Sequence, residues 1–230
     1  MGFLKKFFNN VFEENRVGAH SSSFEMLADE DLEAHLNIDK YDNFLLTDAI
    51  RPSYDVQIKP RQAYRHDVYQ DEATQSNVPV LMASASRTKL FDVFLQLLRP
   101  LGSNVDVVLE TSHNLGADGH EDLYREHIDV PVLISILCEY EDLLMNDGCT
   151  GVAVLNPNTP QEVQFDEHKL LIVYGSPLET YEHILERNGV PCDDDVKFIT
   201  EAEHVHSSCE RYKRQFEELK TRLGMDVAYS

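Results

Sequence analysis

The chain has 230 residues and carries 41 Asp and Glu against 20 Lys and Arg, so its formal net charge at neutral pH is −21. This charge argues against general nucleic-acid binding, because such proteins neutralise phosphates with Lys and Arg. It argues equally against attachment to anionic lipid by charge alone. Hydrophobic residues make up 42% of the sequence, which is enough for an ordinary globular core.

The cysteines and the apolar runs predict where the protein resides. The four cysteines form no C-x-x-C pair and lie among apolar or helical neighbours. In a chain of this length, that spacing predicts reduced thiols and a cytoplasmic protein. The first residues lack the apolar stretch of a secretory signal, and no apolar run approaches membrane-spanning length. We therefore expect a cytoplasmic location.

Residues 1–16 have the periodicity of an amphipathic helix. The apolar stripe of this helix is formed by Phe3, Phe7, Phe8 and Phe12 together with aliphatic neighbours. Four phenylalanines give a short segment a large apolar surface, so we expect them to bind a partner protein, a second copy of the chain or the rest of their own domain. Contact with a membrane surface is a further alternative, which the negative charge of the chain disfavours.

Residues 17–77 are expected to form a linker and an extended arm. Residues 54–58 alternate like an edge strand that ends at a proline. The same region gathers the basic residues Arg51, Lys59, Arg61 and Arg65. Residues 106–167 carry the opposite charge, with fourteen acidic residues and one basic residue. We therefore expect the basic arm to lie on this acidic segment, in the same subunit or in a neighbouring one.

Residues 78–230 alternate between strand and helix patterns. This alternation predicts an α/β or α+β domain, with a mixed sheet covered by helices. A strand at 78–83 is followed by an apolar helix, a second strand at 105–109 and a helix that begins at Pro131. Strands at 151–155, 162–165 and 169–174 are separated by short turn-rich segments, which predicts a three-stranded meander.

The last predicted helix carries the candidate metal ligands. Between Ala202 and Leu223, apolar residues recur at alternating spacings of three and four. We expect this helix to pack on the sheet, with a dimeric coiled coil as the alternative. His206 and Cys209 would share one face of the helix, and His204 precedes them. A metal ion at these three side chains would need further ligands from elsewhere in the fold.

A polar loop after the strand at 105–109 holds the candidate catalytic residues His113, Asp118 and His120. The loop follows the end of a strand, which is where sheets with helical connections tend to place their sites. Its spacing matches no metal motif, and the EF-hand pattern does not fit.

Two functions from different classes follow from these patterns. The first is a non-catalytic interaction protein, which binds a basic partner or itself through the acidic face and the N-terminal helix. The alternative is a metal-assisted hydrolase that uses the 113–122 loop with His204 or His206. No cofactor is expected, because the glycine-rich motifs that hold dinucleotides and nucleotide phosphates are missing from the sequence.

Overall fold

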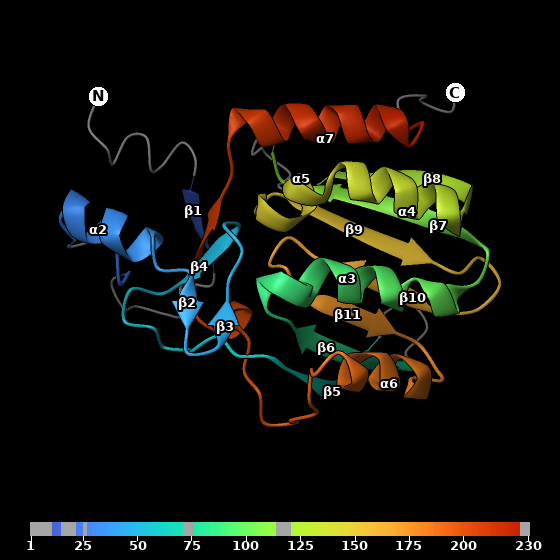
Figure 1. Cartoon of the computed structure of the whole chain (residues 1–230), viewed down its shortest axis with the longest axis horizontal. Coiled ribbons are helices and arrows are strands. Elements are labelled where there is room, and N and C mark those ends of the chain that lie inside the picture. The colour runs from blue at the N-terminus through green and yellow to red at the C-terminus, as the bar shows by residue number, and fades with distance from the viewer. Residues whose placement is uncertain (1–10, 15–21, 25–26, 71–75, 114–120, 226–230) are drawn as a thin grey trace.

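A computed structural model of the chain describes residues 11–14, 22–24, 27–70, 76–113 and 121–225. These residues form a seven-stranded sheet with helices over one face and a three-stranded sheet at one end of it (Figure 1). All strand pairs in the two sheets are antiparallel within the described residues. The α+β alternative is therefore confirmed, whereas the expectation of a mixed sheet is wrong.

The seven-stranded sheet, hereafter the large sheet, contains the strands predicted at 78–83, 105–109, 151–155, 162–165 and 169–174. Its strand order is β5 (Ala63–Gln70), β6 (Asn77–Ser84), β11 (Leu171–Tyr174), β10 (Glu162–Phe165), β9 (Thr150–Leu155), β7 (Asn104–Thr111) and β8 (Glu121–Asp129). The predicted meander is confirmed as β9–β10–β11. It lies between β6 and β7, which run in the same direction. The insertion explains why alternating helices and strands produce an antiparallel sheet here.

The two edge strands are the part of the large sheet that the sequence analysis did not predict. β8 occupies a segment that was expected to be a polar loop, and β5 lies within the expected arm at 17–77. Most side chains of both strands are exposed. Edge strands keep charged and polar side chains that discourage pairing with other molecules, so their composition is similar to that of loops.

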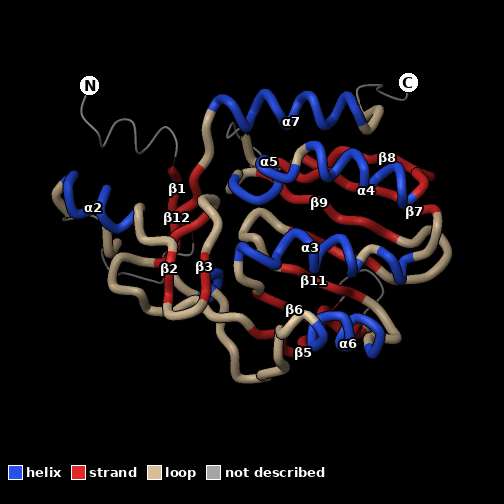
Figure 2. Tube along the Cα trace, in the orientation of Figure 1, coloured by secondary structure: helices blue, strands red, loops and turns tan. Residues whose placement is uncertain are grey.

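The helices over the large sheet supply one side of the main core (Figures 1 and 2). They are α3 (Arg87–Leu97), α4 (Val130–Glu139), α5 (Glu141–Asn146), α6 (Glu179–Arg187) and α7 (Glu210–Arg222). Phe94 of α3 is fully buried, and its ring lies 5.1 Å from that of Phe165 on β10. Each large apolar side chain buried in this way stabilises the fold by about 1.5–3 kcal/mol. Within the described residues, no helix is both long and apolar enough to cross a membrane.

The three-stranded sheet, hereafter the small sheet, joins distant parts of the chain. Its central strand β12 (His204–Ser207) pairs with β1 (Val11–Glu14) on one side and with β4 (Ile50–Pro52) on the other. The shorter elements α2 (Asp29–Leu36), β2 (Lys40–Tyr41) and β3 (Phe44–Leu45) surround it at the same end of the molecule (Figure 2). Two 3₁₀ turns, η1 (Arg99–Leu101) and η2 (Ile199–Glu201), complete the described elements.

Three local predictions are corrected by these assignments. Residues 11–14 form a strand instead of continuing the amphipathic helix, because pairing with β12 overrides a weak helical preference. The last helix begins at Glu210, since residues 204–207 are held as the central strand of the small sheet. Residues 54–58 form no strand. Phe12 lies in β1, whereas Phe3, Phe7 and Phe8 lie outside the described residues.

The basic arm does not lie on the acidic segment of its own subunit in the described contacts. Arg51 is buried and donates to the carbonyl oxygens of Leu36, Thr47 and Ile50. The ion pairs of the other three cations go to Asp42, Asp193, Asp67 and Glu201, all outside residues 106–167. Contact with a neighbouring subunit stays a prediction.

Candidate metal centre

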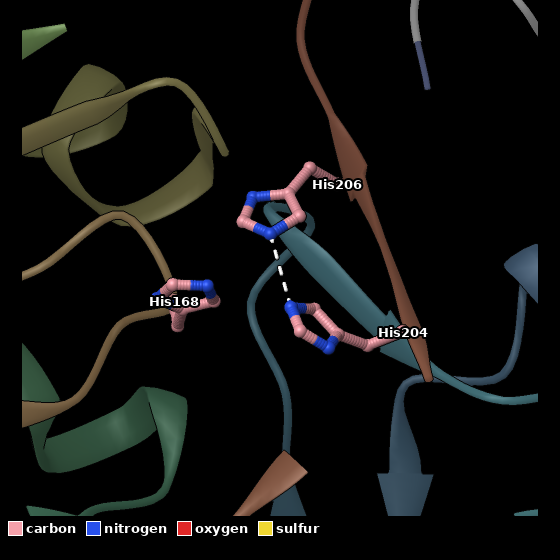
Figure 3. A group of neighbouring side chains, drawn as sticks. All are labelled: His168, His204 and His206. Carbon is pink, nitrogen blue, oxygen red and sulfur yellow. Dashed lines mark hydrogen bonds between the residues drawn. The ribbon is translucent and has the colours of Figure 1, made fainter. Parts of the chain in front are cut away.

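Three histidines from the two sheets converge at the junction between them. His204 and His206 lie on β12, and His168 lies in the loop that joins β10 to β11 (Figure 3). One ring nitrogen from each residue lies within 4.8 Å of the other two. We refer to these three side chains as the histidine cluster. Imidazole nitrogens at such distances are the donor set of zinc and related transition metals.

The strand geometry of β12 explains why two of the three histidines meet. Successive side chains of a strand point to opposite faces, so residues two apart share a face. His204 and His206 are fully buried on one face, and Val205 packs on the other face against Phe24 and Leu32. The sequence His-Val-His therefore places both imidazoles toward the large sheet.

Hydrogen bonds fix the tautomers of the two buried histidines. Nδ1 of His204 lies 2.9 Å from the carbonyl oxygen of Ala202, and Nδ1 of His206 lies 2.7 Å from that of Gly148. A carbonyl oxygen can only accept, so each Nδ1 carries a proton and donates it. The lone pair of each neutral ring is then on Nε2, which is the nitrogen that would bind a metal ion.

The two Nε2 atoms face each other at 3.1 Å. With both Nδ1 atoms protonated, two neutral rings would bring two lone pairs together at this distance. The repulsion is removed when a proton or a metal cation lies between the nitrogens. In tetrahedral zinc coordination with Zn–N bonds of about 2.0–2.1 Å, two nitrogen ligands lie roughly 3.3 Å apart. The observed separation is close to that value.

His168 is oriented by the loop at residues 166–170. Its Nδ1 lies 3.0 Å from Oδ2 of Asp166, so its Nε2 is the nitrogen it can present to the other rings. Oδ1 of the same carboxylate accepts the backbone N–H of Leu170 at 2.7 Å. A carboxylate that orients a ligating histidine is the usual outer shell of a zinc site.

Lys169 anchors this loop from inside the protein. Its backbone has φ of 64°, a left-handed conformation that is uncommon outside glycine. Its buried ammonium group donates to the carbonyl oxygen of Thr150 at 2.8 Å. Burial lowers the pKa of Lys169, and the charge of Asp147 opposes this effect. The loop is thus held both by its own turn and by the start of β9.

Gly148 allows the turn before β9 to contact the small sheet directly. A Cβ atom at this position would lie 2.6 Å from the carbonyl oxygen of Ala49 and 3.0 Å from Cβ of His206. The Gly148 N–H donates to the carbonyl oxygen of Ser207 at 2.8 Å. The absence of a side chain therefore lets His206 reach its backbone acceptor.

The candidate catalytic residue His113 belongs to a separate buried network. Its Nε2 lies 3.0 Å from Oδ2 of Asp147, and its Nδ1 lies 2.8 Å from the hydroxyl oxygen of Thr111. Thr150 donates to the same carboxylate at 2.5 Å. Burial alone would raise the pKa of Asp147, but the hydrogen bond and charge of His113 hold it below its ordinary value. His113, Asp147 and Cys149 also bring one ligand atom each within 4.8 Å of the other two, at the end of β7 and the start of β9.

The other sequence candidates do not join the histidine cluster in the described structure. Cys209 immediately precedes α7 and is absent from the group of converging ligand atoms. Asp118 and His120 lie outside the described residues. Cys149, next to the His113 network, has its thiol pKa raised to about 12 by burial and by the Asp147 charge.

The residue that sequence reasoning missed is His168. It lies 36 residues before His204 and follows Asp166 in a short turn between two strands of the meander. The Asp-x-His sequence in that turn was the available signal, since it pairs a ligand with its orienting carboxylate. Only the tertiary fold places it opposite β12.

A small cavity adjoins the histidine cluster on the side of His168. Its volume is about 30 Å³, and His168, Lys169, Ser84, Thr47 and Phe198 contribute to its lining. A cavity of this size with several polar groups has room for about one or two water molecules. His168 is the residue of the histidine cluster that contributes to this lining.

No family model, curated protein or solved structure matches the chain.

Proposed function

We propose that the protein binds one divalent transition-metal ion, zinc in the first instance, through His168, His204 and His206. The observation that carries this proposal is the pair of Nε2 atoms at 3.1 Å whose Nδ1 atoms both donate to backbone carbonyl groups. A proton shared by His204 and His206 would remove the repulsion between their two Nε2 atoms, but it would not involve His168. The third imidazole, oriented by its own carboxylate, favours a metal ion.

The donor set selects the kind of metal. Neutral imidazole suits zinc, copper, nickel and iron, whereas magnesium and calcium prefer oxygen ligands. The three histidines bring no charge of their own, and the orienting carboxylate of Asp166 lies in the outer shell. Zinc fits this donor set, because it binds nitrogen ligands in a tetrahedral arrangement and does not change its oxidation state.

A metal ion here would tie the small sheet to the large one. His168 belongs to a connection within the large sheet, and the other two ligands lie on the central strand of the small sheet. Binding to the folded state alone stabilises a protein by about 2.7 kcal/mol when the free metal is at 100 times its Kd. The proposal therefore predicts stability that depends on metal concentration.

The test is a metal titration of the full chain after removal of bound ions with a chelator. Zinc should bind and raise the free energy of unfolding, and His168→Ala should remove that increase together with one equivalent of zinc. His168 is the preferred position, since its side chain lies in a turn and is 16% exposed. His183→Ala is the matched control, because His183 is an exposed residue of α6. Equal zinc stoichiometry in the His168→Ala, His204→Ala and wild-type proteins would overturn the proposal.

A hydrolytic role is the second candidate, favoured by the ligand number and the adjacent cavity. Three protein ligands leave a position for water, as in catalytic zinc sites, where the bound water has a pKa of about 7. A metal-assisted hydrolase would then use the histidine cluster in place of the 113–122 loop. Zinc-dependent cleavage of an activated ester, lost in the His168→Ala protein, would support it. Equal cleavage by the metal-free protein would contradict it.

Binding of a basic partner remains a separate proposal, supported by two carboxylates on the large sheet. Asp106 and Glu162 lie in one row with Leu155 and Tyr174 across β7, β9, β10 and β11, on the face opposite the helices. Beside this row is a hollow of about 460 Å³ whose lining includes Tyr69, Tyr174 and Gln164. Retention of the protein on a lysine-rich peptide, lost on Glu162→Gln, would test it.

A further inference from the structure

A second group of ligand side chains lies on the surface at the far edge of the large sheet. It comprises His66 of β5 together with Cys192 and Asp194 from the segment that follows α6. All three residues are exposed. We refer to them as the sulfur site, because Cys192 distinguishes it from the histidine cluster.

The donor atoms have the mutual distances of metal ligands. Nδ1 of His66 lies 3.0 Å from Oδ1 of Asp194 and 3.9 Å from Sγ of Cys192, and the sulfur lies 3.8 Å from the same carboxylate oxygen. Tetrahedral zinc with bonds of about 2.0–2.1 Å to nitrogen and oxygen and about 2.3 Å to sulfur places such ligands roughly 3.3–3.6 Å apart. Adjustments of a few tenths of an ångström in exposed side chains convert one arrangement into the other.

Glu182 of α6 completes the surroundings of the imidazole. Its Oε1 lies 2.9 Å from Nε2 of His66. The hydrogen bonds to Glu182 and Asp194 raise the pKa of His66, so its ring can donate from Nε2 to Glu182 and from Nδ1 to Asp194. A cation that displaces the Nδ1 proton to solvent would bind the lone pair of the atom that faces Cys192 and Asp194, while Nε2 keeps its hydrogen bond to Glu182. This is the carboxylate–histidine arrangement that orients ligands in metal sites.

The backbone holds the three ligands together before any ion binds. The N–H of Tyr64 donates to the carbonyl oxygen of Pro191 at 2.9 Å, and the N–H of Asp193 donates to that of Tyr64 at 2.8 Å. The His66 N–H donates to the Asp194 carboxylate at 3.0 Å. Arg61 pairs with Asp193 at 2.6 Å on the other side of the segment. A site that is already ordered loses little conformational entropy on binding.

From this geometry we infer that His66, Cys192 and Asp194 form a second, solvent-facing site for a thiophilic divalent cation such as zinc, with water in the remaining position. On binding, the Cys192 thiol loses its proton to solvent, so the thiolate and the Asp194 carboxylate balance the charge of the ion. A thiolate ligand favours zinc over magnesium and calcium. The site shares no residue with the histidine cluster, so the two proposals stand or fall separately.

Cobalt(II) provides the test, because a thiolate ligand gives bound cobalt a sulfur-to-metal charge-transfer absorption that nitrogen ligands cannot give. The full chain, reduced and freed of metal, is titrated with cobalt in the wild-type, Cys192→Ser and His168→Ala forms. We expect the sulfur band in the wild-type and His168→Ala proteins, its absence in Cys192→Ser, and its disappearance when zinc is added. Cys138→Ser is the matched control, because Cys138 is also exposed but lies on α4.

The outcomes separate the two sites. Loss of the sulfur band in Cys192→Ser, with the band retained in His168→Ala and Cys138→Ser, supports the inference whether or not the histidine cluster binds zinc. Glu182→Gln should weaken cobalt binding about 10- to 100-fold, as for other outer-shell carboxylates. The absence of a sulfur band in the wild-type protein, or its persistence in Cys192→Ser, would overturn the inference and leave the histidine cluster unaffected.

Discussion

The carbonyl oxygen of Gly148 lies 2.7 Å from Nδ1 of His206, so a turn at the end of the large sheet sets the tautomer of a histidine in the small sheet. The same glycine donates its N–H to Ser207, and Ser207 in turn donates to the carbonyl oxygen of Ala49. Three backbone segments are thus joined by hydrogen bonds immediately beside the proposed metal ligands. The relative positions of the histidine side chains therefore depend on the contact between Gly148 and the small sheet.

Gly148→Ala should disturb this junction. The added Cβ would meet the Ala49 carbonyl oxygen at 2.6 Å, and backbone cannot yield as a flexible side chain does. Overpacking of this kind costs about 1–3 kcal/mol. We expect a lower free energy of unfolding in urea and weaker zinc binding by calorimetry. Gly224→Ala is the control, because its strain lies beyond α7, so it should lower stability and leave zinc affinity unchanged.

Asp166→Asn should weaken zinc binding while the fold persists. The amide can still accept from the Leu170 N–H, but it no longer presents a carboxylate to Nδ1 of His168. Loss of an outer-shell carboxylate lowers metal affinity about 10- to 100-fold. Asp92→Asn on the exposed side of α3 serves as the control, and competition with a chelating dye measures both proteins. Equal affinities would show that Asp166 does not orient a ligand.

Arg51→Met should destabilise the small sheet. The guanidinium is almost fully buried and donates to three backbone carbonyl oxygens, which methionine would leave unsatisfied. Each buried acceptor left without a donor costs about 1–3 kcal/mol, so we expect a total loss of at least about 3 kcal/mol. Arg51 pairs with Val205 across β4 and β12, and zinc affinity should therefore fall with stability. Thermal unfolding with and without zinc distinguishes the two effects. Unchanged stability would contradict the proposed role of the three carbonyl contacts.

Glu162→Gln should stabilise the protein at neutral pH. Burial, with a smaller contribution from the charge of Glu110, raises the pKa of Glu162 from its ordinary 4.5 to about 6. The folded state therefore holds a proton that the unfolded state releases, and stability falls as pH rises from about 4.5 to 6. This difference in pKa corresponds to a loss of about 2 kcal/mol in the free energy of unfolding. Above a pH of about 6, the neutral amide of the Glu162→Gln protein would avoid this loss. Urea unfolding of both proteins from pH 4 to 8 should show the gap opening with pH. A constant gap would mean that Glu162 has an ordinary pKa.

The sequence predicted best those elements whose side chains are buried on both faces or along one complete stripe. Strands β6, β9 and β11 have continuous apolar runs, which are typical of buried strands. In α3, Leu90, Phe94 and Leu97 recur at helical spacing, which predicts a helix. The edge strands β5 and β8 have no such pattern, since their polar side chains face solvent. These two strands are stabilised by pairing with β6 and β7, and their own amino-acid composition does not indicate this pairing.

The candidate metal site was predicted in part for the same reason. His204 and His206 were identified by their chemistry, but the Thr-x-x-Glu sequence at 200–203 favoured a helix that would have separated their directions. Pairing of β12 with two other strands overrides that signal and turns both rings to one side. Cys209 was then grouped with them by a helical spacing that the structure lacks. His168 depends on the approach of two sheets, which no local pattern records.

The pairing of β4 with β12 has a consequence for the biosynthesis of the protein. Pro52 of β4 lies opposite His204, more than 150 residues later in the chain. Contacts of such high sequence separation form slowly, because the loop between them must close first. During synthesis, β4 cannot form its pairing with β12 until β12 has left the ribosome. The proposed zinc site can therefore be completed only after almost the whole described chain has been synthesised, so zinc binding would follow the closure of this long loop.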